Sequence, residues 1–305
     1  MFKGSIIALI TPFTSESEVD YENLKELVNW HIEEGSQGIV CCGTTGECPV
    51  LSDQERVAII KTVVETARHR VPVIAGTGTF DTRTTVKNSI QAKELGVDGC
   101  LVVVPYYNCP TLKGCFLHYR EVSKLEVPII VYHHPKRTGV SLPAQALAEI
   151  CHYPSIVGIK EASASLDLSQ ELICSFQLPV LSGNDLLTHS IMKMGAIGTI
   201  SAAGNIFPKL WRDFIESFIK QDTRRGEEIY ALCTPLLHAL FLETNPQGVK
   251  YALSLMGKSS SHLRLPLTEP DETTKWEIFH SLSKLIPSQL KQQNPSPPFT
   301  HTSVL

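Results

Sequence analysis

Short apolar runs alternate with longer amphipathic stretches along most of the chain. Eight runs have the length and the β-branched, apolar composition of strands that are buried on both faces. They are residues 6–10, 38–42, 73–75, 100–104, 129–132, 156–159, 180–181 and 198–200. Because strands that alternate with helices pair in parallel, the pattern predicts an α/β fold with a parallel sheet.

The clearest helical pattern lies between residues 51 and 71. Apolar residues recur there at helical spacing and fall on one face, namely Val57, Ile60, Val63, Val64 and Ala67. Ser52 is followed three residues later by Glu55, which has the form of a capping box. We therefore expect a helix that begins just after Ser52.

The segments that lead into the predicted strands are of two kinds. A GxxG motif precedes strands two, four and eight, at residues 35–38, 96–99 and 195–198. A proline precedes strands three, five and seven, and strand six also follows one, Pro154. Glycine just past a helix end and proline both stop helices, so these motifs separate helix from strand. Eight such units in about 220 residues predict a closed (β/α)8 TIM barrel, with an open doubly wound sheet as the alternative.

The chain after the eighth strand shows only helical patterns, over residues 207–220, 224–242, 246–256 and 273–285. The first of these completes the eighth unit, and the others form a C-terminal helical appendage. We expect a barrel over residues 1–222, a helical region over 223–287 and a disordered tail over 288–305, where the sequence is polar and proline-rich.

Composition restricts the partners and the location. The 305 residues are 43% hydrophobic and 19% charged with a net charge of -4, so no overall positive field attracts nucleic acid or anionic lipid. No apolar run approaches the roughly 20 residues that span a bilayer. The N-terminus lacks a signal-peptide pattern, and the nine cysteines contain no CxxC motif. We therefore expect reduced cysteines and a cytoplasmic protein that binds neither membrane nor nucleic acid.

A lysine, Lys160, directly follows the apolar run 156–159. One interpretation is a snorkelling or ion-paired lysine, and the other is a nucleophilic amine that forms a Schiff base. A nucleophilic amine must be neutral, and burial beside a second cation such as Arg137 favours the neutral form. Lowering a lysine pKa from about 10.4 to about 7.5 corresponds to roughly 4 kcal/mol. Tyr132, at the end of the neighbouring strand, is either a proton carrier or an ordinary core tyrosine.

Polar residues also follow the other predicted strands, and a parallel barrel brings strand ends together on one face. The loop with Thr44 and Thr45 suits a small carboxylate, and it lacks the lysine of a P-loop. The Gly76-x-Gly78 motif lacks the third glycine of a dinucleotide fingerprint. His133 and His134 are adjacent on a strand end and so point in opposite directions, which is not a zinc-site pattern. We expect no metal and no cofactor.

Five motifs at these strand ends resemble the dihydrodipicolinate synthase family. This family belongs to the class I, Schiff-base-forming aldolases, a superfamily that includes N-acetylneuraminate lyase. The motifs are GTTGE at 43–47, PYYN at 105–108, YHHPKRTG at 132–139, IVGIKEAS at 156–163 and LSGND at 181–185. Their order along the chain matches the family, and the likeness extends from about residue 4 to about residue 256.

The resemblance implies a reaction and a set of residues. Pyruvate forms a Schiff base with Lys160 and condenses with L-aspartate 4-semialdehyde, which gives 4-hydroxy-tetrahydrodipicolinate on the route to diaminopimelate and lysine. The catalytic residues that it implies are Lys160, Tyr132, Thr45 and Tyr107. The substrate-binding residues that it implies are Thr44, Thr45, Arg137, Gly183 and Ile200.

The same resemblance implies a role for individual residues. Thr44 and Thr45 hold the pyruvate carboxylate, and Arg137 holds the carboxylate of the semialdehyde. Tyr107 completes the proton relay in the site of a neighbouring subunit, so the enzyme is a homo-oligomer, a dimer of dimers.

Two features separate this chain from parts of the superfamily. Arg137 favours the synthases, because the sialic acid lyases usually carry an apolar residue at this position. His133 and His134 replace the asparagine and aliphatic residue that commonly follow the strand-five tyrosine. A related keto-acid aldolase or lyase and a non-catalytic barrel are the remaining alternatives.

We predict that L-lysine does not inhibit this enzyme appreciably. Lysine-inhibited members of the family carry two histidines, an asparagine and a glutamate where this chain has Asp53, Arg56, Phe80 and Thr84. The loss of one charge-assisted hydrogen bond costs about 1.5–3 kcal/mol, or roughly 10- to 150-fold in affinity. Initial velocities at subsaturating pyruvate across a lysine titration test this, and half-inhibition at submillimolar lysine would refute it.

Overall fold

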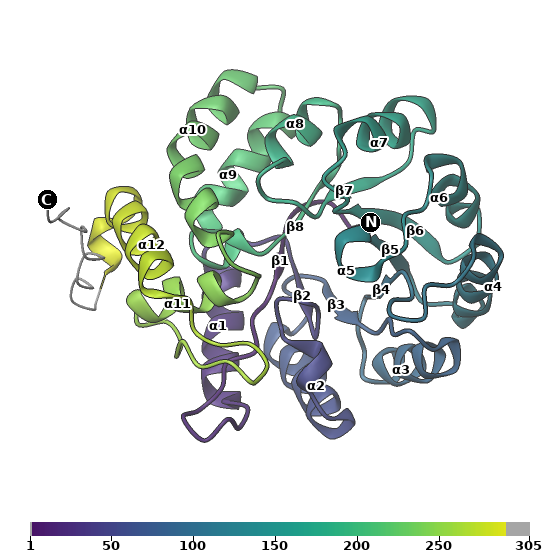
Figure 1. The fold of residues 1–305 in the computed structure, drawn as a ribbon, viewed down its shortest axis with the longest axis horizontal. Coiled ribbons are helices and arrows are strands. Elements are labelled where there is room, and N and C mark those ends of the chain that lie inside the picture. The colour runs from purple at the N-terminus through teal and green to yellow at the C-terminus, as the bar shows by residue number, and fades with distance from the viewer. Residues whose placement is uncertain (1, 291–305) are drawn as a thin grey trace, which may run out of the picture.

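The computed structural model describes residues 2–290, which form a closed barrel of eight parallel strands with helices around it (Figure 1). The strands are β1 (Gly4–Ala8), β2 (Gly38–Cys41), β3 (Val73–Gly76), β4 (Gly99–Val103), β5 (Ile129–His133), β6 (Ile156–Glu161), β7 (Val180–Ser182) and β8 (Gly198–Ser201). They follow one another in chain order, and β8 pairs with β1. That last pairing confirms the predicted TIM barrel and excludes the open sheet.

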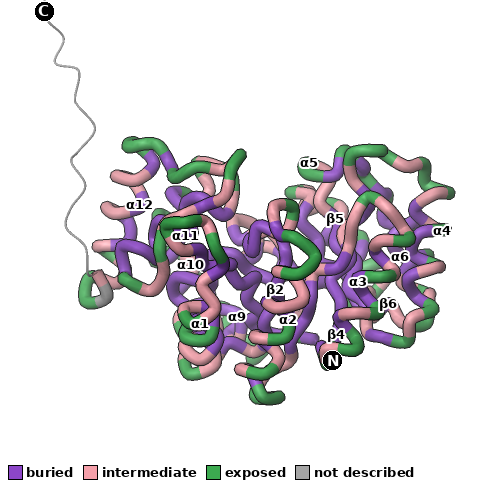
Figure 2. Tube along the Cα trace, turned by 90° about the horizontal axis from the view of Figure 1, so that it is seen from below, coloured by how far each residue is buried: buried purple, intermediate pink, exposed green. Residues whose placement is uncertain are grey.

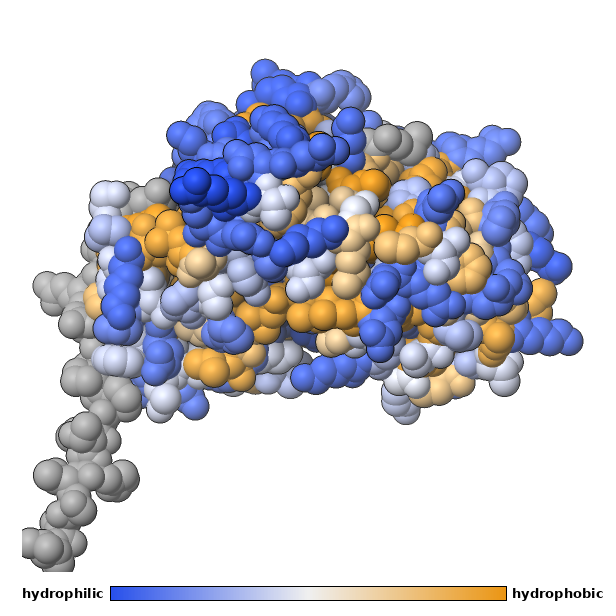
Figure 3. Space-filling model, turned by 90° about the horizontal axis from the view of Figure 1, so that it is seen from above, coloured by the Kyte–Doolittle hydropathy of each residue, from blue (hydrophilic) through white to orange (hydrophobic). Residues whose placement is uncertain are grey.

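The helices lie outside the strands, one or two in each connection (Figure 1). They are α1 (Tyr21–Glu33), α2 (Asp53–Ala67), α3 (Thr82–Glu94), α4 (Leu112–Val122), α5 (Pro135–Thr138), α6 (Ala144–Cys151), α7 (Leu166–Gln170), α8 (Thr188–Lys193), α9 (Pro208–Ile219), α10 (Thr223–Leu240), α11 (Gln247–Leu255) and α12 (Glu272–Leu285). Seen from above, polar side chains cover much of this outer layer, with smaller apolar areas between them (Figure 3).

Two of the predictions about local structure need refinement. Strand β6 continues through Lys160 to Glu161, because Tyr132 and His133 on β5 pair with these two residues. Helix α2 begins with the predicted capping box of Ser52 and Glu55. Its buried face includes Ile59 and leaves Val57 only half-buried, since the helix also packs against α1 and not on the sheet alone.

The barrel contains two apolar layers, and Figure 2 shows buried segments through the middle of the molecule. The interior is packed with side chains from successive strands, and a larger layer fills the space between strands and helices. The interior residues include Ile6, Val40, Ile74, Leu101, Ile130, Leu181 and Ile200. Because strand residues alternate in direction, Tyr132 follows Ile130 inward while His133 points outward.

Helices α10, α11 and α12 pack on one another, and α10 also packs on α9 (Figure 1). The division of the chain at residue 222 stays a prediction. The predicted tail over 288–305 lies, from residue 291 onward, outside the described residues.

A buried ion pair joins the C-terminal region to the loop after β2. Lys250 on α11 is fully buried and donates to the carboxylate of Glu47 and to the carbonyl of His262. Burial lowers the pKa of Lys250 to about 8, although Glu47 opposes the shift. The backbone N–H of Arg264 donates to the second oxygen of Glu47. The glutamate of the GTTGE motif therefore fixes the rim of the barrel and does not face the interior.

Within residues 2–290 no helix is long and apolar enough to cross a membrane. All nine cysteines are unpaired.

Candidate active site

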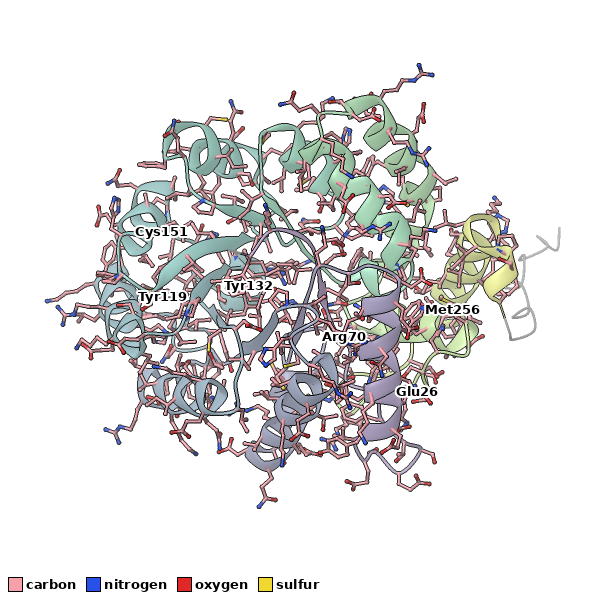
Figure 4. All side chains as sticks on the ribbon, turned by 180° about the vertical axis from the view of Figure 1, so that it is seen from behind. Glu26, Arg70, Tyr119, Tyr132, Cys151 and Met256 are labelled. Carbon is pink, nitrogen blue, oxygen red and sulfur yellow. The ribbon has the colours of Figure 1, made fainter. Side chains whose placement is uncertain are left out.

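The carboxyl ends of the strands surround a cavity of about 620 Å³. Its wall includes all of the predicted site residues except Tyr107, namely Thr44, Thr45, Tyr132, Arg137, Lys160, Gly183 and Ile200. Figure 4 shows Tyr132 near the middle of the barrel, whereas Tyr119 and Cys151 lie in the outer layer of strands and helices. Five strands, β2, β5, β6, β7 and β8, or the loops that follow them thus deliver residues to one space.

Lys160 is the buried cation of this cavity. It projects inward from β6, and only 6% of its surface is exposed. Its Nζ lies 4.3 Å from the centre of the Tyr132 ring. Burial lowers the pKa of Lys160 to about 8, Asp185 opposes the shift and Arg137 adds to it. Roughly a tenth of the amine is therefore neutral at pH 7, far more than for an ordinary lysine with a pKa of about 10.4, and the neutral amine is the nucleophile.

Tyr132 lies directly opposite Lys160 in the β5–β6 pairing. Burial raises the pKa of Tyr132 to about 12, and a hydrogen-bonding contact with Thr44 and the charge of Arg137 reduce the rise. The phenol is therefore protonated at neutral pH. It stands where it can give a proton to a group that reacts with Lys160 and take the proton back.

Gly183 provides the space that Lys160 occupies. A Cβ atom at position 183 would lie 2.9 Å from both Cγ and Cε of Lys160 and 2.9 Å from Cβ of Ala162. Its N–H donates to the carbonyl of Glu161 at 2.7 Å, which fixes β7 against β6. Any larger residue would therefore displace the lysine side chain.

The segment after α10 also reaches the cavity, which the sequence analysis missed. Asn245 Nδ2 donates to Thr45 Oγ1 at 2.9 Å. Arg137 Nη2 donates to Thr244 Oγ1 at 3.3 Å and to the carbonyl of Asn245 at 3.2 Å. This segment belongs to the predicted C-terminal helical region over residues 223–287, and no motif in it resembles a strand-end motif.

Asp185 is the second residue of the site that received no role from the sequence. It is buried, and its Oδ2 accepts hydrogen bonds from the N–H groups of Ala202 and Ala203 at 3.0 and 2.8 Å. Burial raises the pKa of Asp185, and these backbone donors oppose the rise. Asp185 ends the LSGND motif, so an acidic residue shortly after a buried strand was the feature of the sequence that could have indicated its place in the site.

The two adjacent histidines point to opposite sides of β5, as predicted. His133 Nε2 accepts from the N–H of Leu142 at 3.1 Å, so its Nδ1 carries the proton that it donates to Glu161 Oε2 at 2.7 Å. Both side chains are fully buried outside the barrel. They fasten β5 to β6 directly behind Tyr132 and Lys160. His134, in contrast, lines the cavity.

Tyr107 does not reach the cavity of its own chain. It has a positive φ of 67° and is 89% exposed. Its neighbour Tyr106 lines a second cavity of about 190 Å³, whose wall shares Thr44, Tyr132, His134 and Arg137 with the first. Phe80, half-exposed, packs its edge against the ring of Tyr106 at 5.6 Å between centroids.

Comparison with known proteins agrees with this geometry. The model of the dihydrodipicolinate synthetase family matches residues 1–285. A 4-hydroxy-tetrahydrodipicolinate synthase from Trichlorobacter lovleyi is 43% identical over 281 residues, which are 91% of this chain and 97% of that protein.

Two solved structures are similar over almost their whole length. A chloride-inhibited dihydrodipicolinate synthase from Acinetobacter baumannii, complexed with pyruvate, has a TM-score of 0.92 and 38% identity, with 93% of this chain and 99% of that chain covered. A structure described as the first monomeric dihydrodipicolinate synthase variant has a TM-score of 0.91 and 36% identity, with 95% and 98% covered.

Proposed function

We propose how individual residues of this chain, which belongs to the dihydrodipicolinate synthetase family, carry out the family's reaction. The chain functions as a 4-hydroxy-tetrahydrodipicolinate synthase, a lyase of lysine and diaminopimelate biosynthesis that works through a lysine Schiff base. The observation that carries the residue assignment is the buried amine of Lys160, whose pKa is lowered to about 8 and which faces Tyr132 in the cavity.

The first half of the reaction joins Lys160 to pyruvate. The neutral Nζ attacks the ketone carbon, and the ketone oxygen leaves as water with two protons that come from the amine and pass through the Tyr132 phenol. The imine then loses a proton from its methyl carbon while its nitrogen gains one, which gives an enamine. Asp185 stabilises the cationic forms of the imine nitrogen, because its negative charge already favours the protonated form of Lys160.

The second half joins the enamine to L-aspartate 4-semialdehyde. The enamine carbon bonds to the aldehyde carbon, the aldehyde oxygen takes a proton from the relay, and the imine forms again. The amino group of the second substrate then attacks the imine carbon and displaces Lys160, which closes the ring of the product. The reaction needs no oxidant or reductant. Each proton that the relay donates in one step it takes back in another.

The carboxylates bind at two ends of the cavity in this proposal. The hydroxyls and backbone of Thr44 and Thr45, with the wall at Ile200, hold the carboxylate of pyruvate beside Lys160. Arg137 holds the carboxylate of the semialdehyde, since its planar fork can donate two parallel hydrogen bonds. Its present partners, Thr244 and Asn245, are neutral and are therefore weaker competitors for the guanidinium.

Tyr107 completes the relay from a second copy of the chain in this proposal. Tyr107 is exposed and follows Tyr106 in the chain, and Tyr106 packs against Phe80 and lines the second cavity. Each protomer of a pair would insert Tyr107 into the other, and two such pairs would form the dimer of dimers. The unpaired cysteines and the absence of a spanning helix within the described residues agree with a cytoplasmic location, which we also propose.

We predict that borohydride traps pyruvate on Lys160. Incubation with pyruvate and borohydride, followed by peptide mass mapping, should locate the reduced adduct on this lysine. Lys250 is the matched control. Its pKa is also lowered to about 8, but its Nζ donates to Glu47 away from the cavity, so it should carry no adduct. Lys160→Met should abolish the adduct and turnover, whereas Lys136→Met, on the rim, should keep the adduct. An adduct on another lysine, or none, refutes the assignment.

We also predict that Tyr107 acts in the site of a partner. Tyr107→Phe should lower turnover by roughly 10²–10⁴, the worth of one proton-transfer group. Co-expression with Lys160→Ala should restore activity, because a mixed pair contains one site with an intact lysine and an intact tyrosine.

Random pairing should restore roughly a quarter of the native sites, since half of the symmetric pairs are mixed and each has one complete site. Co-expression of Lys160→Ala with Tyr132→Phe is the matched control, because no site in that mixed pair is complete. The role is contradicted if co-expression of Tyr107→Phe with Lys160→Ala restores no activity. It is also contradicted if sedimentation shows that the fully active enzyme is a monomer.

A further inference from the structure

His134 is a cavity wall residue for which the mechanism above has no use. It lies at the end of β5, occupies the N-cap position of α5 without a side-chain cap and contributes to the walls of both cavities. Its ring makes an edge-to-face contact with that of Tyr132, with 5.8 Å between centroids. His134 is half-buried, and part of it lines the space where the substrates meet in the mechanism above.

The ring has unused hydrogen-bonding capacity. Nδ1 of His134 is buried and has no hydrogen-bond partner within residues 2–290. A buried polar atom without a partner destabilises the folded protein by about 1–3 kcal/mol, so its presence calls for a partner that the protein itself does not supply. His133 differs in this respect, because both of its ring nitrogens are occupied by Glu161 and Leu142.

The charges around the cavity keep this ring neutral. Burial lowers the pKa of His134 to about 4, the cations Arg137 and Lys160 add to the shift, and its own backbone opposes it weakly. A neutral imidazole has one nitrogen that donates and one that accepts a hydrogen bond. One nitrogen of the His134 ring can therefore accept a hydrogen bond in the cavity wall.

We propose that His134 is a specificity-determining residue that accepts a hydrogen bond from the α-ammonium group of the second substrate while Arg137 holds its carboxylate. The proposal rests on the function proposed above and adds a contact to it. His134 and Arg137 lie on the same turn, and the N–H of Arg137 donates to the carbonyl of His134 at 2.9 Å. An α-carboxylate and an α-ammonium are attached to the same carbon, so two adjacent groups on one turn suit them.

The other acceptors in the wall are occupied or are placed differently. Both carboxylate oxygens of Glu243 are occupied, one by the side chain of Gln247 and one by the N–H of Asp271, each at 2.9 Å. Asp185 Oδ2 is held by Ala202 and Ala203, whereas its Oδ1 has no partner within residues 2–290 and its charge acts on Lys160. Asn245 Oδ1 also has no partner there, but the nitrogen of the same amide donates to Thr45. His134 is the acceptor that lies on the same turn as Arg137.

The test compares L-aspartate 4-semialdehyde with 4-oxobutanoate, which keeps the aldehyde and the carboxylate and lacks the amino group. In His134→Leu, kcat/KM for the semialdehyde should fall roughly 10- to 150-fold, the worth of one hydrogen bond to a charged group. The KM for pyruvate and the inhibition constant of 4-oxobutanoate should change by no more than about twofold, because neither compound carries the amino group that His134 contacts. His134→Gln, which keeps a neutral acceptor, should recover part of the loss.

Two controls make the result interpretable. His238→Leu changes an exposed histidine on α10, outside the cavity wall, and should alter neither constant. Borohydride trapping of pyruvate on Lys160 in His134→Leu shows that this variant is folded. Failed trapping in the unaltered protein would instead refute the proposed function, and not the contact of His134. An equal loss for both aldehydes, or no loss for either, would overturn the proposal.

Discussion

The structure depends on a lysine amine held out of water at the mouth of a closed barrel. An ammonium group is poorly stabilised there, and the cost of its desolvation appears as a pKa of about 8 for Lys160. The shift from the ordinary value near 10.4 corresponds to roughly 3 kcal/mol. The fold supplies this through Ile200 and the other interior side chains below the amine and through Gly183 beside it, where a Cβ would lie within 2.9 Å of the lysine. Asp185 limits the shift, so the amine can still carry a proton during turnover.

Precise placement of Lys160 requires that the strand ends do not move relative to one another. Three buried polar contacts provide this, two of them outside the cavity and one, that of Asp185, in its wall. His133 and Glu161 fasten β5 to β6, Asp185 fastens the end of β7 to the segment after β8, and Glu47 with Lys250 fastens the loop after β2 to α11. Each pair is buried, and removal of one partner would leave the other without compensation, at a cost of about 3–5 kcal/mol for a buried ion pair. The residues of the cavity are thus positioned by buried polar contacts between segments.

Much of this arrangement follows from the sequence because its causes are local or periodic. The apolar runs, the GxxG and X-Pro motifs and the capping box at Ser52 each depend on neighbouring residues, and a barrel then brings Thr44, Tyr132 and Lys160 to one face. The contributions of Asn245 and Asp185 depend on contacts between segments far apart in the chain. No periodic signal predicts that Asn245 reaches Thr45 across 200 positions, or that Asp185 binds the backbone of Ala202. Tyr107 is a third kind of case, because the role proposed for it depends on a second chain.

The claim that desolvation activates Lys160 is tested most directly by the pH dependence of imine formation. The rate of borohydride trapping with saturating pyruvate should be measured from pH 6 to pH 11 on the unaltered protein. The neutral amine is the reactive form, so the rate should rise about tenfold per pH unit at low pH and become level above the lysine pKa. The account predicts a midpoint near the lowered pKa of about 8. A rate that continues to rise to about pH 10.4, the value of an ordinary solvated lysine, would contradict it.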